Sequence, residues 1–361
     1  MKNQHQIRDI RFFRAKSPVS QPIADATHSI SDIDFFVTEI ETAAGVIGQG
    51  YLLSFHYFPR AVTGALFDVA DFARQYSVFE TVRMAKDFAV ESEYFGNNGL
   101  LKWIQASINI AMWDAWSKSI GQPIWKVLGS GVRAVHVYGS GGWLSYSDQE
   151  LVDEVVRYQK RGLQAVKIKV GAKEPGRDIQ RLRKVREAVG KEMKIMMDAN
   201  QGMDVPSAIA LAREAYDIGI TWFEEPVVHT DFAGYEMIRA KTGISLAMGE
   251  REFDLEALKA LIARNALDLW QPDLLRIGGV EQWRDSAALA AAHHIPVLPH
   301  YYKDYDVPLL CTIPNGYGAE SFDWIDGLID NPMPIVNGMA HPRLGNGWGF
   351  SFLHDKMTEI K

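Results

Sequence analysis

The hydrophobic and polar positions of this chain follow one pattern in its first third and another in the rest. Residues 36–42 (FVTEIET) and 46–53 (VIGQGYLL) are β-rich runs separated by Ala-Ala-Gly, a spacing that predicts a hairpin. Between residues 102 and 120, apolar side chains recur at steps of three and four until Gly121 and Pro123, which predicts an amphipathic helix. We therefore expect the first third to be an α+β domain.

Beyond residue 131, short apolar runs alternate with helical segments. Strands are predicted at 135–139, 165–170, 194–200, 220–226, 244–250, 267–273 and 295–300, and helices at 178–190, 205–219, 255–266 and 284–294. Seven strand-like runs at regular spacing favour a closed parallel barrel over an open doubly wound sheet. No G-x-G-x-x-G motif follows the first of these strands, so a dinucleotide-binding fold has little support.

Composition narrows the class of protein. The 361 residues are 47% hydrophobic and 23% charged, as expected for a folded enzyme rather than a disordered chain. The net charge of −7 argues against binding to nucleic acid, and the single cysteine, Cys311, excludes an intramolecular disulfide and a cysteine-rich zinc site. No stretch is apolar enough to span a membrane and the first residues form no apolar leader, so we expect a cytoplasmic protein with no membrane partner.

Polar side chains recur where the predicted barrel strands end. Barrel enzymes carry their active sites at this edge, so such residues would meet at one rim. They are Lys167, Lys169, Asp198, Asn200, Glu224, Glu225, Glu250, Asp273 and His300, with Glu320 where an eighth strand is due. Taken singly, each is more often a helix cap, a surface charge or a satisfied core residue. Their recurrence at successive strand ends favours a shared site.

The residue types indicate the chemistry of such a site. Carboxylates without Cys or His neighbours form an oxygen-rich site suited to Mg²⁺. Lys167 and Lys169 point to the same face of a strand, and a nearby cation and metal would lower the pKa of a lysine enough for it to act as a base. His300, oriented by Asp273, would be a second acid or base opposite them. A metal between two such groups suits removal of the proton α to a carboxylate.

These motifs resemble those of the enolase superfamily, specifically its mandelate racemase subgroup. VKIKV carries the paired lysines, MDANQ, FEEP and MGE resemble three metal-ligand motifs, QPDLLRIGGV followed by LPH resembles an Asp–His dyad, and GAESFDW carries a glutamate. AMWDAWSKSIGQPIWKVLG (111–129) resembles the helix before the family's barrel. The resemblance implies an α/β fold: an N-terminal α+β capping domain (1–130), a modified (β/α)7β TIM barrel (131–325), and a C-terminal segment (326–361) that returns to the cap.

The resemblance also implies roles for individual residues. Asp198, Glu224 and Glu250 would be the ligands of Mg²⁺. Lys169 would be the base on one face of the substrate, and Lys167 would help to neutralise the substrate carboxylate.

On the other face, the resemblance implies that the His300–Asp273 dyad acts as the acid or base. Asn200 would contact a substrate hydroxyl, and Glu320 would hydrogen-bond the substrate carboxylate. Cycloisomerases and dipeptide epimerases of the superfamily carry a lysine where Asp273 stands, so the aspartate points to the racemase and acid-sugar dehydratase branch. Arg276 is expected to support the site rather than act as a base, because arginine stays protonated at ordinary pH.

Two reactions compete within that branch: dehydration of a sugar acid to a 2-keto-3-deoxy acid, and racemisation or epimerisation of a 2-hydroxy acid. GSGGWLSYSDQELVDEV (139–155) and the segment 168–190 resemble the talarate/galactarate dehydratases, which favours the first reaction. Polar residues of the cap, His28, His56, Tyr57 and Arg60, are candidates for binding a hydroxylated chain, and Lys303 for a distal carboxylate. The expected substrate is a small sugar acid, either an aldarate such as galactarate or talarate, or an aldonate.

Two other classes of function remain open. A non-catalytic descendant of the barrel would have lost a metal ligand or both bases, and the sequence retains them. A transition-metal hydrolase would need several histidines at strand ends, where only His300 stands. Because members of the family form dimers or octamers, the resemblance also implies a homo-oligomer.

Overall fold

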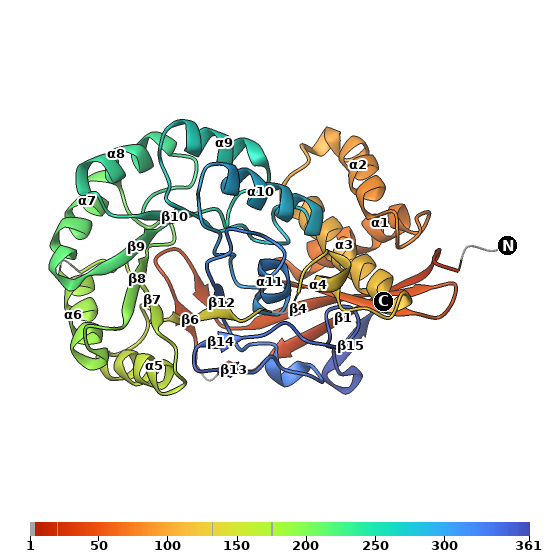
Figure 1. Cartoon of the computed structure of the whole chain (residues 1–361), viewed down its shortest axis with the longest axis horizontal. Helices are drawn as coiled ribbons and strands as arrows, with labels where there is room; N and C mark the ends of the chain where they lie inside the picture. Colours follow the sequence, from red (N-terminus) through yellow and green to blue (C-terminus); the bar gives the residue numbers. More distant parts are fainter. Residues whose placement is uncertain (1–3, 20, 132, 175) are drawn as a thin grey trace.

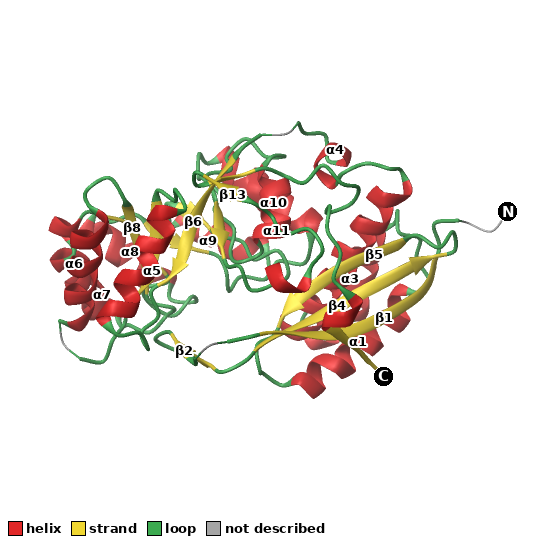
Figure 2. Cartoon of the chain, turned by 90° about the horizontal axis from the view of Figure 1, so that it is seen from below, coloured by secondary structure: helices red, strands yellow, loops and turns green. Residues whose placement is uncertain are grey.

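The computed structural model describes residues 4–19, 21–131, 133–174 and 176–361. An antiparallel sheet with three long helices lies beside a ring of strands that is surrounded by further helices (Figure 1). Seen from below, the sheet of β1, β4 and β5 and the strands β6 and β8 lie towards opposite ends of the molecule (Figure 2). No helix in the described ranges has both the length and the apolar character needed to cross a membrane.

The N-terminal part is an α+β domain. Its sheet has the order β15-β1-β4-β5, and the predicted hairpin is confirmed as the antiparallel pair β4–β5. Its elements are β1 (Ile7–Ser17), β4 (Ile33–Thr42), β5 (Ile47–Leu53), α1 (Pro59–Ala73), α2 (Thr81–Glu91), α3 (Gly99–Ser119) and α4 (Ile124–Val127), with a short hairpin of β2 (Ile23–Ala24) and β3 (Ser29–Ile30). The helix predicted at 102–120 is α3, and sequence reasoning did not identify β1.

Two glycines of β5 let α3 lie directly on the sheet. A Cβ at Gly48 would collide with the carbonyl oxygen of Ala111, and a Cβ at Gly50 with that of Ser107. Any larger residue at these positions would push α3 away from the sheet.

The second part is a closed parallel barrel. Its strands are β6 (Val135–Gly141), β7 (Ala165–Lys169), β8 (Lys194–Asp198), β9 (Ile220–Glu224), β10 (Leu246–Met248), β11 (Leu269–Trp270) and β12 (Ala319–Ser321). They run β6-β7-β8-β9-β10-β11, and β12 pairs back onto β6. Between β11 and β12, Val297 completes the ring with single bridges to Trp270 and Gly316, so the strand predicted at 295–300 is reduced to one bridging residue.

Helices cover the outside of the barrel. They are α5 (Asp148–Lys160), α6 (Arg177–Val189), α7 (Val205–Glu214), α8 (Phe232–Thr242), α9 (Leu255–Ala263), α10 (Val280–Ala292) and α11 (Lys303–Leu310). Each predicted helix is present, whereas α5, α8 and α11 had not been located from the sequence. The expected capped (β/α) barrel is therefore confirmed.

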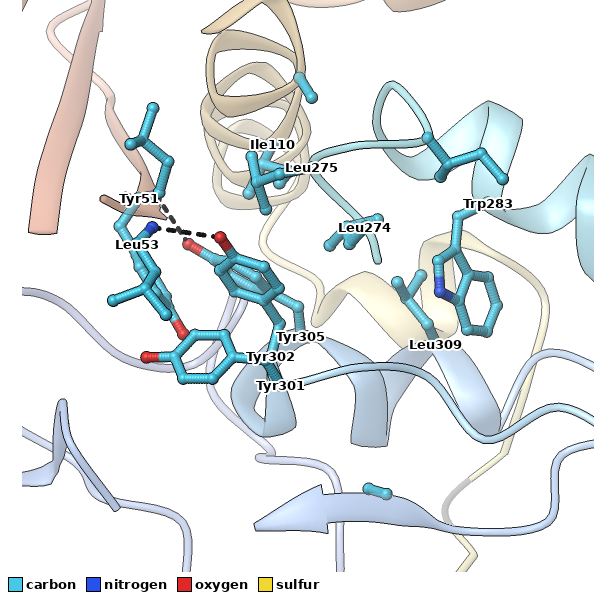
Figure 3. Close-up of a cluster of buried hydrophobic side chains, with 14 of the residues drawn as sticks. Tyr51, Leu53, Ile110, Leu274, Leu275, Trp283, Tyr301, Tyr302, Tyr305 and Leu309 are labelled. Atoms are coloured by element: carbon cyan, nitrogen blue, oxygen red, sulfur yellow. Dashed lines mark hydrogen bonds between the residues drawn. The ribbon is translucent and has the colours of Figure 1, made fainter. Parts of the chain in front are cut away.

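Tyrosines at the start of α11 join the barrel to the cap (Figure 3). The Tyr302 hydroxyl accepts a hydrogen bond from the backbone N–H of Leu53, at 3.1 Å, and the Tyr305 hydroxyl accepts one from Tyr51, at 3.0 Å. The C-terminal segment continues this seam: β13 (Ile335–Val336) pairs with β14 (Met339–Ala340), β14 pairs with β6 of the barrel, and β15 (Met357–Ile360) pairs with β1 of the cap.

Candidate active site

Backbone pairing brings the strand-end residues together. In the register of β7, β8 and β9, Lys169 lies beside Asp198, and Asp198 lies beside Glu224. Glu224 lies beside Ala247 of β10, and Glu250 follows soon after that strand. The carboxyl ends of these parallel strands therefore hold their polar side chains at one rim.

The two lysines of β7 are buried and ion-paired. Lys167 Nζ lies 2.5 Å from Glu224 Oε1 and 2.7 Å from Glu320 Oε1, and Lys169 Nζ lies 2.6 Å from Asp198 Oδ2. Burial disfavours the charged form of Lys169, but the negative charges of Asp198, Asp25 and Glu250 together outweigh it and raise the pKa of Lys169. The lowered lysine pKa expected from the sequence is not found with these partners. That expectation took account of the neighbouring cation, Lys167, but not of the short distance between Lys169 and the Asp198 carboxylate.

His300 is held in one orientation by Asp273. Its Nδ1 lies 2.8 Å from Asp273 Oδ2, and its Nε2 lies 3.4 Å from Glu250 Oε2. The other oxygen of Asp273 accepts backbone hydrogen bonds from Leu275 and Arg276, both at 2.9 Å, so the carboxylate itself is fixed. Burial favours the neutral ring, but the charges of Glu250 and Asp273 outweigh it and raise the pKa of His300.

The donor set has the chemistry of a hard-cation site. Asp198, Glu224 and Glu250 are all buried, and burial raises the pKa of Glu224 to about 7 despite its lysine partner. In the part of the chain that the structure describes, no three His, Cys, Asp or Glu side chains close around one point, because each carboxylate faces a lysine or His300 instead. Buried carboxylate oxygens on neighbouring strands nevertheless fit Mg²⁺ and not a soft metal. Binding it would require these side chains to exchange their present partners for the cation.

A cavity of about 560 Å³ opens over these groups. From the barrel it is lined by Lys169, Asn200, Glu250, Asp273, Arg276, His300 and Glu320, and from the cap by His28 and Tyr57. Lys167, Asp198 and Glu224 are buried and do not line it. Asn200 lines the cavity with an Oδ1 atom that is buried and has no partner in the structure, a position suited to a substrate hydroxyl.

Three residues considered for substrate binding do not line this cavity. His56 lies beside Tyr57, at 4.3 Å between ring centroids, but is absent from the lining. Arg60 lies in a separate surface hollow beside β1 and β15. Lys303 is in α11, fully buried, with Nζ 3.0 Å from Asp323 Oδ1 and 3.3 Å from Asp326 Oδ1. The helix at 303–310 turns this lysine away from the substrate side.

The hairpin β2–β3 carries a polar loop across from the cap to the barrel. The Ala24 carbonyl accepts a hydrogen bond from Leu144, at 2.8 Å, and the Thr27 hydroxyl donates one to the carbonyl of Asn200, at 3.1 Å. This contact places His28 in the cavity with its Nδ1 3.1 Å from Asp25. The sequence contained a signal for this pair that was not used: Asp25 stands three residues before His28, a spacing that a turn can close.

Other cavity residues were also missed. His229 and Arg251 follow β9 and β10, and each is paired with a carboxylate: His229 Nδ1 lies 2.8 Å from Glu252, and Arg251 Nε lies 3.2 Å from Glu250. Aromatic side chains line the cavity as well, at Phe55, Trp143, Tyr301, Phe322 and Trp324. The sequence contained a signal for Phe322 and Trp324, because they stand at every second position after Glu320 and so point to the same side of an extended segment.

Family models match almost the whole chain. The model described as "Mandelate racemase / muconate lactonizing enzyme, N-terminal domain" matches residues 7–129. The model described as "Enolase C-terminal domain-like" matches residues 150–356.

Individual relatives carry out different reactions. The chain is 27% identical to L-talarate/galactarate dehydratase of Salmonella typhimurium, over 96% of this chain and 89% of the relative. The solved structure of that enzyme, liganded with Mg and L-lyxarohydroxamate, gives a TM-score of 0.91 over 97% of this chain and 93% of that one. D-galactarolactone cycloisomerase of Agrobacterium fabrum is 34% identical over 74% of this chain and 76% of its own.

A racemase from Streptomyces coelicolor, solved with bound magnesium, is 25% identical, with a TM-score of 0.92 over 98% of this chain and all (100%) of that one. Two of these similar structures thus contain magnesium, the cation expected from the carboxylates. The two family models, the capped barrel and these relatives agree. This chain belongs to the enolase superfamily, with the two-domain organisation of the mandelate racemase and muconate lactonizing enzymes.

Proposed function

We propose that this protein is a Mg²⁺-dependent hydro-lyase that acts on a hydroxylated carboxylic acid and releases water to give a 2-keto-3-deoxy acid. The observation that carries the proposal is the pair of opposed acid/base groups in one cavity: Lys169 on β7, and His300, held by Asp273, after Val297. In the order of the ring, β8, β9, β10 and β11 lie between them, and Asp198, Glu224 and Glu250 stand at or just after the ends of the first three.

The residues of this chain divide the reaction between them. Lys169, having released its own proton to solvent water, takes the proton α to the substrate carboxylate, and the C–H electron pair moves towards that carboxylate. Lys167, a buried ammonium paired with Glu224 and Glu320, lies behind the cavity lining, and its positive charge would favour the negative charge that develops on the substrate. Mg²⁺, held by Asp198, Glu224 and Glu250, would supply further charge stabilisation there.

Elimination completes the chemistry. The electron pair then expels the β-hydroxyl, to which His300 delivers a proton, so that water leaves. The resulting enol takes up a proton at C3 and becomes the 2-keto acid. Asp273 keeps the imidazole aimed at the cavity throughout, as its 2.8 Å contact with Nδ1 supports.

One alternative has a specific observation in its favour. Two acid/base groups on separated strands are also what 1,1-proton transfer needs, and the similar Streptomyces coelicolor structure is named a racemase. In that reaction one group removes the α-proton, the other group donates a proton to the same carbon, and no hydroxyl leaves.

A panel of hydroxylated acids, incubated with the protein and Mg²⁺, separates the two reactions. Dehydration produces 2-keto acid, detected with semicarbazide, whereas racemisation removes optical rotation without keto acid. Lys169→Ala serves as the inactive variant, and Lys259→Ala, on the exposed face of α9, as the matched lysine control. Rotation lost with no keto acid would replace the proposed dehydration by racemisation.

A further inference from the structure

A buried arginine reaches the rim of the barrel from one of the surrounding helices. Arg181 lies in α6, with 1% of its surface exposed, and the proposed chemistry does not use it. Its Nη1 donates a hydrogen bond to the carbonyl of Lys169, at 2.7 Å, and its Nη2 donates to the carbonyls of Gly142 and Trp143, at 2.7 and 2.8 Å. One guanidinium therefore joins the last residue of β7 to the first two residues after β6.

Burying the charge of Arg181 is costly unless its donors are well bonded. Burial lowers the pKa of Arg181 to about 10, so the side chain is still charged at neutral pH. In the described residues, its hydrogen bonds all go to backbone carbonyls and none goes to a carboxylate. A planar guanidinium can bind several carbonyls in fixed directions, which the compact ammonium of a lysine cannot do. The bonds of Arg181 therefore fix backbone rather than pair charges.

The backbone that Arg181 binds carries the proposed base. The N–H of Lys169 donates to the Gly142 carbonyl, at 3.2 Å, and its carbonyl accepts from Arg181, so both peptide groups of the residue are tied. Gly142 has a φ of 59°, and a Cβ there would lie 2.9 Å from Ile168 Cδ1. This close turn leads directly into Trp143, whose ring centroid lies 5.3 Å from Lys169 Nζ. Arg181 thus anchors both the base and the ring beside it.

A second arginine of α6 makes similar bonds at the other end of the barrel. Arg186 donates hydrogen bonds to the carbonyls of Ile218, at 2.9 Å, and Met193, at 2.6 Å. Met193 precedes β8 and Ile218 precedes β9, so these carbonyls lie at the amino ends of the strands, away from the rim that carries the site. Arg186 therefore has the bonding of Arg181 without its position.

We propose that Arg181 is a positioning residue: by binding the carbonyls of Lys169, Gly142 and Trp143, it holds the base and the ring beside it in the place that proton removal needs. This role rests on the proposed function, which makes Lys169 the base. It gives an arginine outside the barrel an effect on the rate of proton transfer, because a displacement of about 1 Å at the reacting groups can cost about 100-fold in rate.

Steady-state kinetics of matched variants test this role. With Mg²⁺ and the best substrate among galactarate, talarate and galactonate, Arg181→Met should lower kcat by about 10- to 100-fold and leave KM nearly unchanged. Arg186→Met is the control, because it removes the same kind of bonds and should lower Tm while keeping the kcat of wild type. An unchanged kcat in Arg181→Met, or an equal loss of kcat in Arg186→Met, would overturn the proposal.

Arg181→Lys separates the placement of the backbone from the charge, and it carries the test if Arg181→Met is too unstable to assay. Lysine keeps the positive charge but cannot hold three carbonyls in fixed directions, so kcat should remain about tenfold or more below that of wild type. A wild-type kcat in Arg181→Lys would show that the bonds of the guanidinium do not matter, and would overturn the proposal.

Backbone hydrogen exchange separates this role from the proposed function, because it needs no substrate. In Arg181→Met, mass spectrometry should find exchange faster by about tenfold or more in segments 142–146 and 168–171, whereas Arg186→Met should leave both segments unchanged. Faster exchange there, with no keto acid formed by wild type, would leave the anchoring by Arg181 standing and count against dehydration. Unchanged exchange in these segments, with keto acid formed by wild type, would overturn the anchoring and leave dehydration standing.

Discussion

At the scale of single residues, Glu224 is a buried carboxylate at the end of β9 with polar partners on both oxygens. Its carboxylate contacts Lys167 Nζ and accepts a hydrogen bond from Gln271 Nε2, at 2.7 Å. Burial holds the pKa of this carboxyl at about 7 in spite of these partners. A buried carboxyl with such a raised pKa readily loses its proton and becomes a carboxylate when a divalent cation binds beside it.

Glu224→Gln should weaken Mg²⁺ binding by more than the roughly 10–100-fold that follows loss of an outer partner of a metal ligand. Glutamine keeps the size of the side chain but supplies one neutral oxygen. Calorimetric titration with Mg²⁺ measures the effect, with Glu256→Gln on the exposed surface of α9 as control. Unchanged Mg²⁺ affinity in Glu224→Gln would show that Glu224 is not a ligand of the metal.

Asp273→Asn should lower kcat by about 10–100-fold, the range seen when a partner that orients a functional histidine is lost, and leave KM nearly unchanged. His300→Asn should cost more, because it removes the acid itself. Steady-state kinetics of the two variants provide the comparison. A larger defect in Asp273→Asn than in His300→Asn would show that His300 is not the residue that transfers the proton.

Part of the site could be predicted at this scale. Strand-end positions follow from the period of the chain, so Lys169, Asp198 and Glu224 were found from the sequence and lie beside one another. The ion pairs could not be predicted, because they depend on side-chain positions across three strands. For the same reason, the sequence indicated a lowered pKa for Lys169, whereas contact with Asp198 raises it.

At the scale of elements, helix α11 decides what Lys303 can do. The segment YYKDYD follows His300, and from the sequence Lys303 was a candidate for binding a distal carboxylate. The structure places Lys303 at the start of a helix whose residues are all buried. Helix formation here depends on long-range contacts, such as those of Tyr302 and Tyr305 with β5, and these have no local signal.

The close packing of α3 on β5 gives a prediction for this scale. Gly48→Ala should destabilise the protein by about 1–3 kcal/mol, because the new Cβ would overlap the backbone of Ala111. Gly64→Ala, inside α1 with open space around the new Cβ, is the matched control and should be neutral or stabilising by up to about 1 kcal/mol. Urea unfolding of both variants measures the difference. Equal effects at the two positions would contradict the described contact.

At the scale of the whole molecule, cap and barrel build the site together. The barrel supplies the ionisable groups, and the cap supplies His28, Tyr57 and Phe55 to the same cavity. The C-terminal segment fastens the two parts: Trp348 donates a hydrogen bond from Nε1 to the carbonyl of Ile110 in α3, at 3.1 Å. The barrel class was predictable from the alternation of strands and helices, whereas β1, whose partners lie at both ends of the chain, was not.

Metal binding should be visible in the stability of the whole chain. A ligand that binds only the folded state adds about 2.7 kcal/mol at a concentration 100 times its Kd. Saturating Mg²⁺ should therefore raise Tm, EDTA should reverse the rise and abolish activity, and Mg²⁺ or Mn²⁺ should restore both. The rise should be absent in Glu224→Gln. An equal rise in that variant would place the stabilising cation elsewhere.

The most direct test of the proposed mechanism follows the α-proton in D₂O. The protein with Mg²⁺ is incubated with a panel of hydroxylated mono-acids and diacids, and the products are read by proton NMR for wild type, Lys169→Ala and His300→Asn. Wild type should convert at least one acid to a 2-keto-3-deoxy acid with deuterium at C3, and each variant should be slower by about 10²–10⁴-fold. Keto acid formed at the wild-type rate by both variants, or deuterium at C2 with no keto acid, would contradict the account.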